Sequence, residues 1–233
     1  MRLAIMQPYF LPYIGYWQLL GAVDRFVIYD RIKYTKKGWI NRNRFLLNGH
    51  AEVFSLPLRK ASDDLDVVDR WIAPDFDPGK LLAQWQGAYR RAPHFGPTMA
   101  VMEAVLACPS RNLFEFIHHS VKTVAGHLGV ETEIIVSSTL PPEATAPSGA
   151  EKVMAICGAS GATSYINPIG GTELYDKHEF ARRGIELAFL RALPLEYPQF
   201  GAPHVPWLSI VDVLMFNPLA EVRGRLLRAW EAL

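Results

Sequence analysis

The sequence predicts an α/β fold: a mostly parallel sheet of Rossmann-like βαβ units, with a helical subdomain inserted at about residues 78–130. Two observations support this prediction. Near both ends of the chain, short apolar runs are separated by a loop and a helical pattern, which is the layout of a βαβ unit. Between these units, from Pro78 to Val130, apolar residues recur at spacings of three and four, as on one face of a helix. We expect residues 1–233 to form a single domain.

Composition narrows the partners and the compartment. The chain has 24 basic and 23 acidic residues and a net charge of +1, so we expect no bulk attraction to nucleic acid. No apolar stretch approaches the roughly 18 residues that a membrane-spanning helix needs, so we expect no membrane insertion and a cytoplasmic location. Two cysteines occur, Cys108 and Cys157, without the spacing of metal ligands, and we expect neither a metal site nor another cofactor.

The first βαβ unit begins with the apolar run Leu3–Met6. This predicted strand ends at Gln7, because the proline after it cannot donate to a sheet ladder. Pro12 suits the first turn of the helix that follows. A second strand is predicted at Arg25–Asp30. Gln7 and Asp30 thus stand at strand ends, and ligands of open parallel sheets bind beyond the carboxyl ends of the strands.

A basic segment follows at residues 31–44, where six lysines and arginines are interleaved with aromatic and amide side chains. Such a segment is suited to clamp an anionic group on a ring-bearing ligand. A third strand is predicted at Val53–Leu58. We interpret the aspartates that come after it as solvated or capping residues without a catalytic role: Asp63, Asp64, Asp66 and Asp69.

Helices are predicted across residues 78–130, the last of them capped by Ser110. His118 lies beside the apolar stripe of that helix and is interpreted as a packed histidine. His94 lies in the proline-rich turn Arg91–Pro97 and is a candidate for acid or base catalysis; the alternative is a structural or exposed histidine.

A further strand is predicted at Glu131–Ser138, followed by a proline-rich loop at residues 141–147. Ser148 is expected to cap the next helix, because a glutamate stands three residues later. Cys157 lies on the last apolar turn of that helix and is interpreted as an inert, buried thiol.

The second βαβ unit consists of a strand at Thr163–Asn167, a helix at Thr172–Arg183 and a strand at Ile185–Leu190. Gly170 and Gly171 precede the helix. Glycines there let the backbone approach a ligand closely and direct N–H groups at an anion. The alternative is that the two glycines serve only the geometry of the turn.

The last part of the chain is predicted to close the molecule. Residues 194–206 contain four prolines and form an ordered loop over the site. The apolar run Leu208–Met215 is predicted to be a helix. Its Asp212 needs a partner among apolar neighbours, either an arginine of the basic segment or solvent. Residues 218–233 are predicted to form one amphipathic helix.

These segments predict one cleft between the two βα turns, with the basic segment as its positive wall. The candidate general bases are Asp30, His94 and Asp176. The candidate substrate contacts are amides, aromatic rings, cations and backbone groups: Gln7, Tyr9, Tyr13, Tyr16, Lys33, Lys36, Trp39, Asn41, Arg42, Asn43, Asn167, Gly170, Gly171 and Tyr175. Core packing is the alternative for the aromatic residues.

The sequence also resembles a known family, the WbqC-like protein family. The resemblance rests on the runs QPYFLPYIGYWQLL, VDRFVIYDRIKY, GWINRNRF, YINPIGGTELYDKHEF and LSIVDVLMFN, spread from Met1 to about Asn217. The family is found largely in bacterial polysaccharide and O-antigen gene clusters. The resemblance therefore implies a bacterial enzyme of surface-sugar or secondary-metabolite biosynthesis, a transferase, without implying a particular reaction.

The leading hypothesis is a metal-independent transferase that moves an acyl, aminoacyl or glycosyl group onto an amino or hydroxy acceptor. Its substrate is sugar-like or aminoacyl, and a thioester donor would make an acyl carrier protein a partner. One alternative is a non-catalytic protein that binds a nucleotide sugar. Another is a degenerate nucleotidylyltransferase, in which tyrosines after the first strand replace the histidines of that class. The chain contains no GxxxxGK[ST], GxGxxG, GxSxG or HExxH motif.

Overall fold

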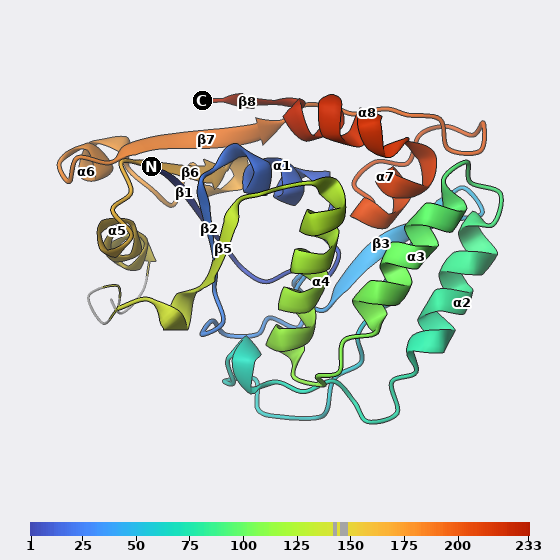
Figure 1. Cartoon of the computed structure of the whole chain (residues 1–233). Coiled ribbons are helices and arrows are strands. Elements are labelled where there is room, and N and C mark those ends of the chain that lie inside the picture. The colour runs from blue at the N-terminus through green and yellow to red at the C-terminus, as the bar shows by residue number, and fades with distance from the viewer. Residues whose placement is uncertain (142–143, 145–148) are drawn as a thin grey trace.

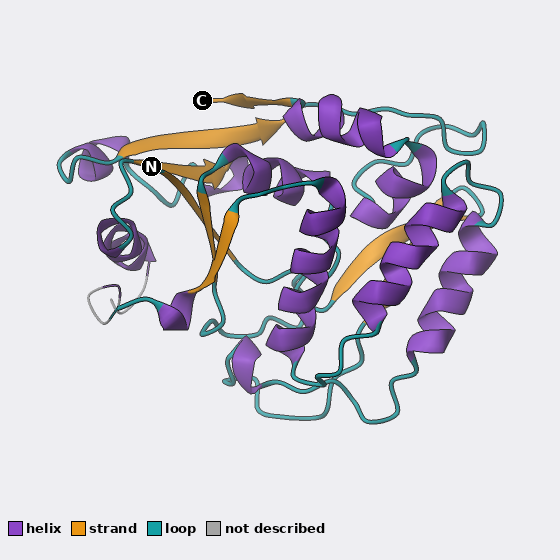
Figure 2. Ribbon diagram, in the orientation of Figure 1, coloured by secondary structure: helices purple, strands orange, loops and turns teal. Residues whose placement is uncertain are grey.

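The computed structural model describes residues 1–141, 144 and 149–233, so the predicted Ser148 cap and most of the loop at 141–147 lie outside the described residues. A six-stranded sheet with the strand order β5-β2-β1-β6-β7-β8 forms the centre (Figures 1 and 2). Its strands are β1 (Arg2–Met6), β2 (Arg25–Ile28), β5 (Glu133–Val136), β6 (Ser164–Pro168), β7 (Glu186–Ala192) and β8 (Trp230–Ala232). All neighbours are parallel except β7 and β8, which confirms the predicted α/β class with a mostly parallel sheet.

Helices cover both faces of this sheet (Figure 1). Side chains alternate along a strand, so Ala4 of β1 packs into one core while Leu3 and Ile5 pack into the other. The Ala4 core contains residues of α1 (Ile14–Ala22), α4 (Leu113–Leu128), α7 (Ile210–Phe216) and α8 (Leu219–Gly224). The opposite core contains residues of α5 (Gly149–Ala159) and α6 (Lys177–Ala181).

The helices predicted between residues 78 and 130 are confirmed as α2 (Pro78–Tyr89), α3 (Phe95–Leu106) and α4. Their status as an inserted subdomain of a single domain stays a prediction. The predicted cap of α4 was wrong. Asn112 caps this helix, accepting the Glu115 backbone N–H at 3.1 Å, whereas Ser110 lies outside it. Both residue types are good caps, and the helix begins two residues later than expected.

The chain forms a separate antiparallel hairpin of β3 (Arg42–Leu47) and β4 (His50–Ser55). It begins at the end of the basic segment, where no strand was predicted. The strand predicted at Val53–Leu58 therefore begins and ends too late, and the second part of the basic segment is a strand. Asn48 and Gly49 connect the two strands with φ angles of 50° and 80°. Two residues of positive φ form the tight hairpin turn that the Asn-Gly pair favours.

Two predicted helices in the C-terminal half are shorter than expected. The helix expected at Thr172–Arg183 begins at α6, because Asp176 caps it and accepts the backbone N–H groups of the next turn at 2.7 and 3.1 Å. Residues 218–233 do not form one helix. After α8 the chain turns and adds β8 to the sheet edge, where its backbone groups pair with β7.

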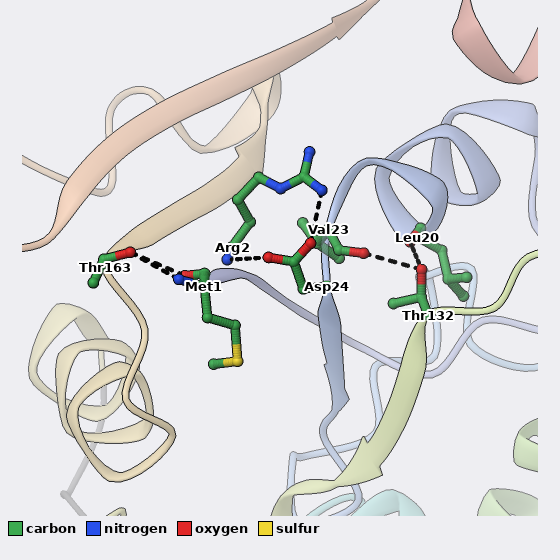
Figure 3. Close-up of polar contacts among 7 residues, drawn as sticks. All are labelled: Met1, Arg2, Leu20, Val23, Asp24, Thr132 and Thr163. Atoms are coloured by element: carbon green, nitrogen blue, oxygen red, sulfur yellow. Dashed lines mark hydrogen bonds and ion pairs between the residues drawn. The ribbon is translucent and has the colours of Figure 1, made fainter.

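The amino ends of β1 and β2 are closed by polar contacts (Figure 3). The Arg2 guanidinium pairs with the Asp24 carboxylate at 2.7 Å, and the Met1 ammonium donates to Thr163 Oγ1 at 2.9 Å. The Thr132 hydroxyl lies 2.7 and 3.0 Å from two carbonyl oxygens at the end of α1. The polar groups at this end of the sheet thus find hydrogen-bond or ion-pair partners within the chain itself.

Candidate functional site

A pocket of about 1190 Å³ opens at the carboxyl ends of β1, β6 and β7, beside the residue that follows β2. From β1 the chain extends outward to β2 and β5 and then returns to β6 on the other side of β1. Open α/β sheets bind their ligands at this reversal of strand order, beyond the strand ends. Three segments form the pocket walls: the turn after β1, the glycine turn after β6 and the basic segment.

Most of the predicted substrate contacts line this pocket: Gln7, Tyr9, Tyr13, Tyr16, Lys33, Trp39, Asn43, Asn167, Gly170, Gly171 and Tyr175. They come from segments far apart in the sequence. The structure therefore brings the two βα turns and the basic segment to one cavity. The four tyrosines among them also belong to a core or pack against one, whereas Trp39 is exposed.

Three predicted contacts lie outside the pocket lining and serve the structure of the basic segment itself. Lys36 forms an exposed ion pair with Asp63 at 2.9 Å. The buried Asn41 side chain donates to the Leu56 carbonyl at 2.8 Å. The Arg42 guanidinium donates to two carbonyl oxygens of the preceding turn at 2.7 and 2.9 Å. These groups shape the positive wall without facing the cavity.

The turn after β1 places Gln7 between two tyrosines. The Tyr9 hydroxyl donates to Gln7 Oε1 and the Tyr16 hydroxyl donates to the Gln7 carbonyl, both at 3.3 Å. Burial raises the pKa of Tyr9, and burial together with the nearby Tyr9 raises the pKa of Tyr16 well above its usual value. Both hydroxyls therefore stay protonated at neutral pH and act as neutral hydrogen-bond groups.

The two glycines of the turn after β6 differ in what surrounds them. A Cβ atom at Gly171 would lie 1.8 Å from Nδ2 of Asn167, so any larger residue there would displace the Asn167 side chain. A Cβ at Gly170 would meet nothing within 4 Å. Asn167 in turn accepts the Tyr165 hydroxyl at 3.0 Å. Packing thus explains Gly171, whereas Gly170 borders open space in the pocket.

The pocket wall is strongly positive. Its basic side chains are Arg31, Lys33, Arg44, Lys152 and Arg191, against one acidic side chain, Asp66, among the described residues. Lys33 pairs with Asp64 at 3.0 Å, but both side chains are more than two-thirds exposed, so water screens this pair. The Lys152 ammonium lies 4.8 Å from the ring centroid of Tyr29. An anionic ligand group is favoured at this wall.

Asp30, a predicted general base, does not line the pocket. β2 ends at Ile28, and it is Tyr29 that lines the cavity. The Asp30 carboxylate accepts the Ser137 hydroxyl at 2.7 Å and the Ser138 backbone N–H at 3.0 Å. Burial alone would raise the pKa of Asp30, but these hydrogen bonds outweigh it and lower the pKa. Asp30 fastens the end of β2 to the segment after β5.

The other two predicted bases also lie outside the pocket lining. His94 precedes α3, and its backbone N–H donates to the Met215 carbonyl at 3.1 Å. Asp176 caps α6. Capping accounts for Asp176, whereas the His94 side chain makes no capping hydrogen bond.

Both alternatives expected for Asp212, a pair with Arg42 or Arg44 of the basic segment or exposure to solvent, were wrong. Asp212 is fully buried and accepts hydrogen bonds from the Tyr89 hydroxyl at 2.8 Å, the Tyr197 hydroxyl at 2.7 Å and the Gln199 amide at 2.6 Å. Burial raises its pKa, although these donors oppose the rise. The carboxylate anchors residues 194–207, a segment we term the strap, onto α2 and α7.

Comparison with known proteins agrees with the motifs in the sequence. A sequence profile of the WbqC-like protein family matches residues 7–224. The chain belongs to the WbqC-like protein family. A relative in Mycobacterium tuberculosis, named "Uncharacterized protein Rv1507c", is 25% identical over 225 residues, covering 94% of this chain and 95% of the relative. No solved structure matches the chain significantly.

Sequence reasoning placed Arg31 and Arg44 in the basic wall without naming them as contacts, and it missed further pocket residues of this WbqC-like protein: Tyr29, Asp66, Lys152, Arg191 and Trp207. Some left a local signal. Tyr29 follows a strand end, and Arg44 shares a face of β3 with Arg42 because side chains alternate along a strand. Lys152 and Trp207 come from distant segments that only the tertiary fold brings to the pocket.

The WbqC-like pocket combines cations with neutral hydroxyl donors. Five tyrosines line it, and burial raises the pKa of each: Tyr9, Tyr13, Tyr16, Tyr29 and Tyr175. Protonated phenols and buried amides can bind the hydroxyls of a polyhydroxylated ligand, while the basic side chains hold its anionic group. The arrangement therefore suits a ring-bearing, anionic small molecule.

Other candidate groups lie elsewhere or are lacking in the described part of this WbqC-like chain. Cys157 is buried outside the pocket lining, which confirms its predicted burial, and burial raises the pKa of its thiol to about 12. Its inertness stays a prediction. Residues 1–141, 144 and 149–233 contain no cluster of three or more His, Cys, Asp or Glu side chains suited to a metal ion. None of their helices is long and apolar enough to span a membrane.

Proposed function

We propose that this WbqC-like protein is a biosynthetic transferase of bacterial surface-polysaccharide or secondary metabolism. It moves an acyl, aminoacyl or glycosyl group to the amino or hydroxy group of a sugar-like acceptor. The observation that carries the proposal is the convergence of five tyrosines and five basic side chains on one pocket at the reversal of strand order. Such a reversal is typical of Rossmann-like sheets, and we propose that the βαβ units here are of that kind.

The basic wall supports an anionic donor or acceptor. Arg31 is exposed and Lys152 is half-buried, and both line the cavity. The screened pair of Lys33 with Asp64 costs little to exchange for a phosphate or carboxylate. A thioester donor would arrive on an acyl carrier protein, an acidic partner that the exposed side chain of Arg31 would attract.

Transfer to an amine or hydroxyl needs a proton acceptor, and Asp66 is the one carboxylate of the pocket lining in the described part of the chain. It is half-buried, and its side chain does not cap the short 3-10 helix (Val67–Asp69) that it precedes. It is therefore free to face a substrate. This role replaces our interpretation of Asp66 as a capping or solvated residue.

In the proposed step, the lone pair of the acceptor nitrogen or oxygen attacks the electrophilic carbon of the donor. The bond between that carbon and the leaving group breaks, and the leaving group departs with the bonding electrons. The proton of the acceptor passes to the Asp66 carboxylate. The basic wall stabilises the negative charge that develops on the leaving group.

The test is mass spectrometry of the protein incubated with acyl or aminoacyl thioesters or nucleotide sugars, each with amino-sugar and hydroxy-sugar acceptors. We expect a product heavier than the acceptor by the transferred group. Asp66→Asn should lower turnover by about 10²- to 10⁴-fold, the usual contribution of a general base. Asp63→Asn, in the same acidic cluster but outside the pocket lining, is the matched control and should retain turnover. Equal turnover of Asp66→Asn and wild type would remove the assigned base.

A second candidate is a protein that binds a nucleotide sugar without transforming it. One observation favours it. Among the described residues, Asp66 is the one aspartate, glutamate, histidine or cysteine in the pocket lining, so the pocket offers few side chains of the types that usually act as acid, base or nucleophile. This candidate predicts saturable binding of a nucleotide sugar with no product under any donor and acceptor combination.

A further inference from the structure

Two exposed tryptophans stand at the same pocket. The side chain of Trp39 is 41% exposed and that of Trp207 is 61% exposed, and both line the cavity. Trp39 comes from the basic segment and Trp207 from the end of the strap. Large indole rings are normally well covered in a folded protein, and exposed ones gathered at a concave site mark a binding surface.

Arg44 joins the two tryptophans. Its guanidinium carbon lies 5.3 Å from the ring centroid of Trp39, and its Nη2 donates to the Trp207 carbonyl at 3.1 Å. Its Nε is buried and has no hydrogen-bond partner in the described part of the chain. Arg44 itself lines the pocket, so one cation contacts both tryptophan residues at the cavity.

The backbone of Trp207 is strained. Its φ angle is +60°, in the left-handed region that a bulky residue rarely adopts. The chain is held there because the Ser209 backbone N–H donates to the Arg44 carbonyl at 2.8 Å, and the Trp207 ring packs edge-on against Tyr13 at 5.5 Å between centroids. Strain of this kind concentrates at ligand sites, where the fold holds a side chain in a set position.

The strap fixes this position before any ligand binds. The Gln199 amide donates to the buried Asp212 carboxylate at 2.6 Å, and its side-chain oxygen accepts the Val205 backbone N–H at 2.7 Å. The Tyr197 hydroxyl donates to the same carboxylate at 2.7 Å. The indole of Trp207 is therefore presented on an ordered segment, which reduces the entropy lost when a ring stacks on it.

We propose that Trp39, Arg44 and Trp207 form a subsite that stacks against the base of a nucleoside phosphate, while Lys33 and Lys152 bind its phosphates. Indole rings and a guanidinium offer flat faces to a planar ring, and base–aromatic stacking tolerates any base. A nucleoside phosphate carries both a planar ring, which would contact the two indole rings, and an anionic group, which would contact the two lysines. This inference rests on the proposed function, since it names the donor class for the same pocket.

The test compares ligands with and without a base. Isothermal titration calorimetry and tryptophan fluorescence would be recorded with uridine diphosphate, adenosine diphosphate, inorganic pyrophosphate and ribose 5-phosphate. We expect both nucleotides to bind at least about tenfold more tightly than the two ligands without a base, the lower range of stacking on aromatic side chains, and to quench the fluorescence.

Variants locate the effect. Trp207→Gly removes the ring at a φ angle that glycine adopts readily, and it should weaken nucleotide binding about tenfold while leaving pyrophosphate binding unchanged. Trp39→Leu should act in the same direction. The matched control is Trp71→Leu: Trp71 is 46% exposed and lies 6.0 Å from the Arg59 guanidinium, but it is outside the pocket lining, so its loss should change neither affinity. Circular dichroism verifies the fold of each variant.

The outcomes separate the two proposals. Equal affinity for nucleotides and pyrophosphate, unchanged in Trp207→Gly and Trp39→Leu, would overturn the ring subsite and leave an anion-binding pocket intact. Absence of binding by every phosphate, or nucleotide binding that Lys33 and Lys152 substitutions do not weaken, would overturn the phosphate assignment. The proposed transferase is overturned separately, if no combination of donor and acceptor yields a product.

Discussion

The two ends of the parallel sheet are hollowed alike but differ in how their polar groups are satisfied. At the amino end, a hollow of about 790 Å³ borders Arg2, Asp24 and Thr132. These groups pair with one another or with backbone carbonyls (Figure 3). At the carboxyl end, a pocket of about 1190 Å³ borders Arg31, Arg44 and other cations with one acidic side chain among the described residues.

The difference shows why volume alone does not identify a site. The two hollows lie at opposite ends of the sheet and share β1, so contact with the sheet does not separate them. The carboxyl end is where the strand order reverses and where loops from several βα turns meet. Three of its five cations, Arg31, Arg44 and Lys152, form no ion pair among the described residues, and an anionic ligand would supply the missing charge. The following variants sharpen or break this contrast, from the largest expected effect to the smallest.

Gly171→Ala should have the largest effect. The added Cβ would lie 1.8 Å from Asn167 Nδ2, so Asn167 must shift. We expect the free energy of unfolding to fall by about 1–3 kcal/mol, as for other overpacked sites, with ligand affinity lost as well. Urea denaturation and calorimetric titration measure both. Gly170→Ala is the control, since a Cβ there meets nothing within 4 Å; equal destabilisation by the two changes would contradict the packing we describe.

Removing positive charge from the pocket wall should have the second-largest effect. Lys33→Met with Lys152→Met should weaken binding of uridine diphosphate by about tenfold or more and flatten its dependence on salt. Stability should hardly change, because Lys33 is largely exposed. Arg2→Met at the amino end is the matched control, and its affinity for the nucleotide should equal that of the wild type.

Asp30→Asn tests a structural carboxylate at the carboxyl end. The pKa of Asp30 is lowered in the folded protein, so its stabilisation is present above the unfolded pKa, about 3.9, and is lost as pH falls through the folded pKa. We expect unfolding free energy to drop by about 1–2 kcal/mol at pH 7, with the difference from wild type shrinking below about pH 4. Denaturation across this pH range checks it. Turnover loss without loss of stability would instead restore Asp30 as a catalytic candidate.

Asp24→Asn should have the smallest effect. The side chains of Asp24 and Arg2 are about half exposed, and pairs of this kind contribute less than about 1 kcal/mol. Hydrogen bonds from Arg2 lower the pKa of Asp24, so this small contribution is present near neutral pH and lost in acid. Thermal unfolding should shift slightly, and ligand affinity should not. A clear loss of affinity would assign function to the amino end.

Local patterns were sufficient for much of the fold. The apolar run before Gln7 and the proline-led helix after it gave the first βαβ unit, and helical spacing gave α2, α3 and α4. Errors came where a short-range signal was overlooked. The Asn48-Gly49 pair marks the hairpin turn between β3 and β4, and Asp176 marks the start of α6.

The candidate site was harder to predict, because a shift of one or two residues in the end of a strand changes which side chain lines the pocket. β2 ends at Ile28, so Tyr29 lines the pocket and Asp30 does not. Asp212 sits in a run of apolar residues, and its partners Tyr89 and Gln199 come from distant segments. No periodicity reveals such long-range partners, since only tertiary packing brings them together.

Hydrogen–deuterium exchange of the full chain, with and without saturating uridine diphosphate, tests the central claim that the carboxyl end of the sheet is the ligand site. We predict slower exchange in the segments that line the larger pocket, residues 5–16, 29–44 and 167–175, and no change at residues 21–24 and 128–132 of the amino-end hollow. Protection confined to the amino-end segments would contradict the account.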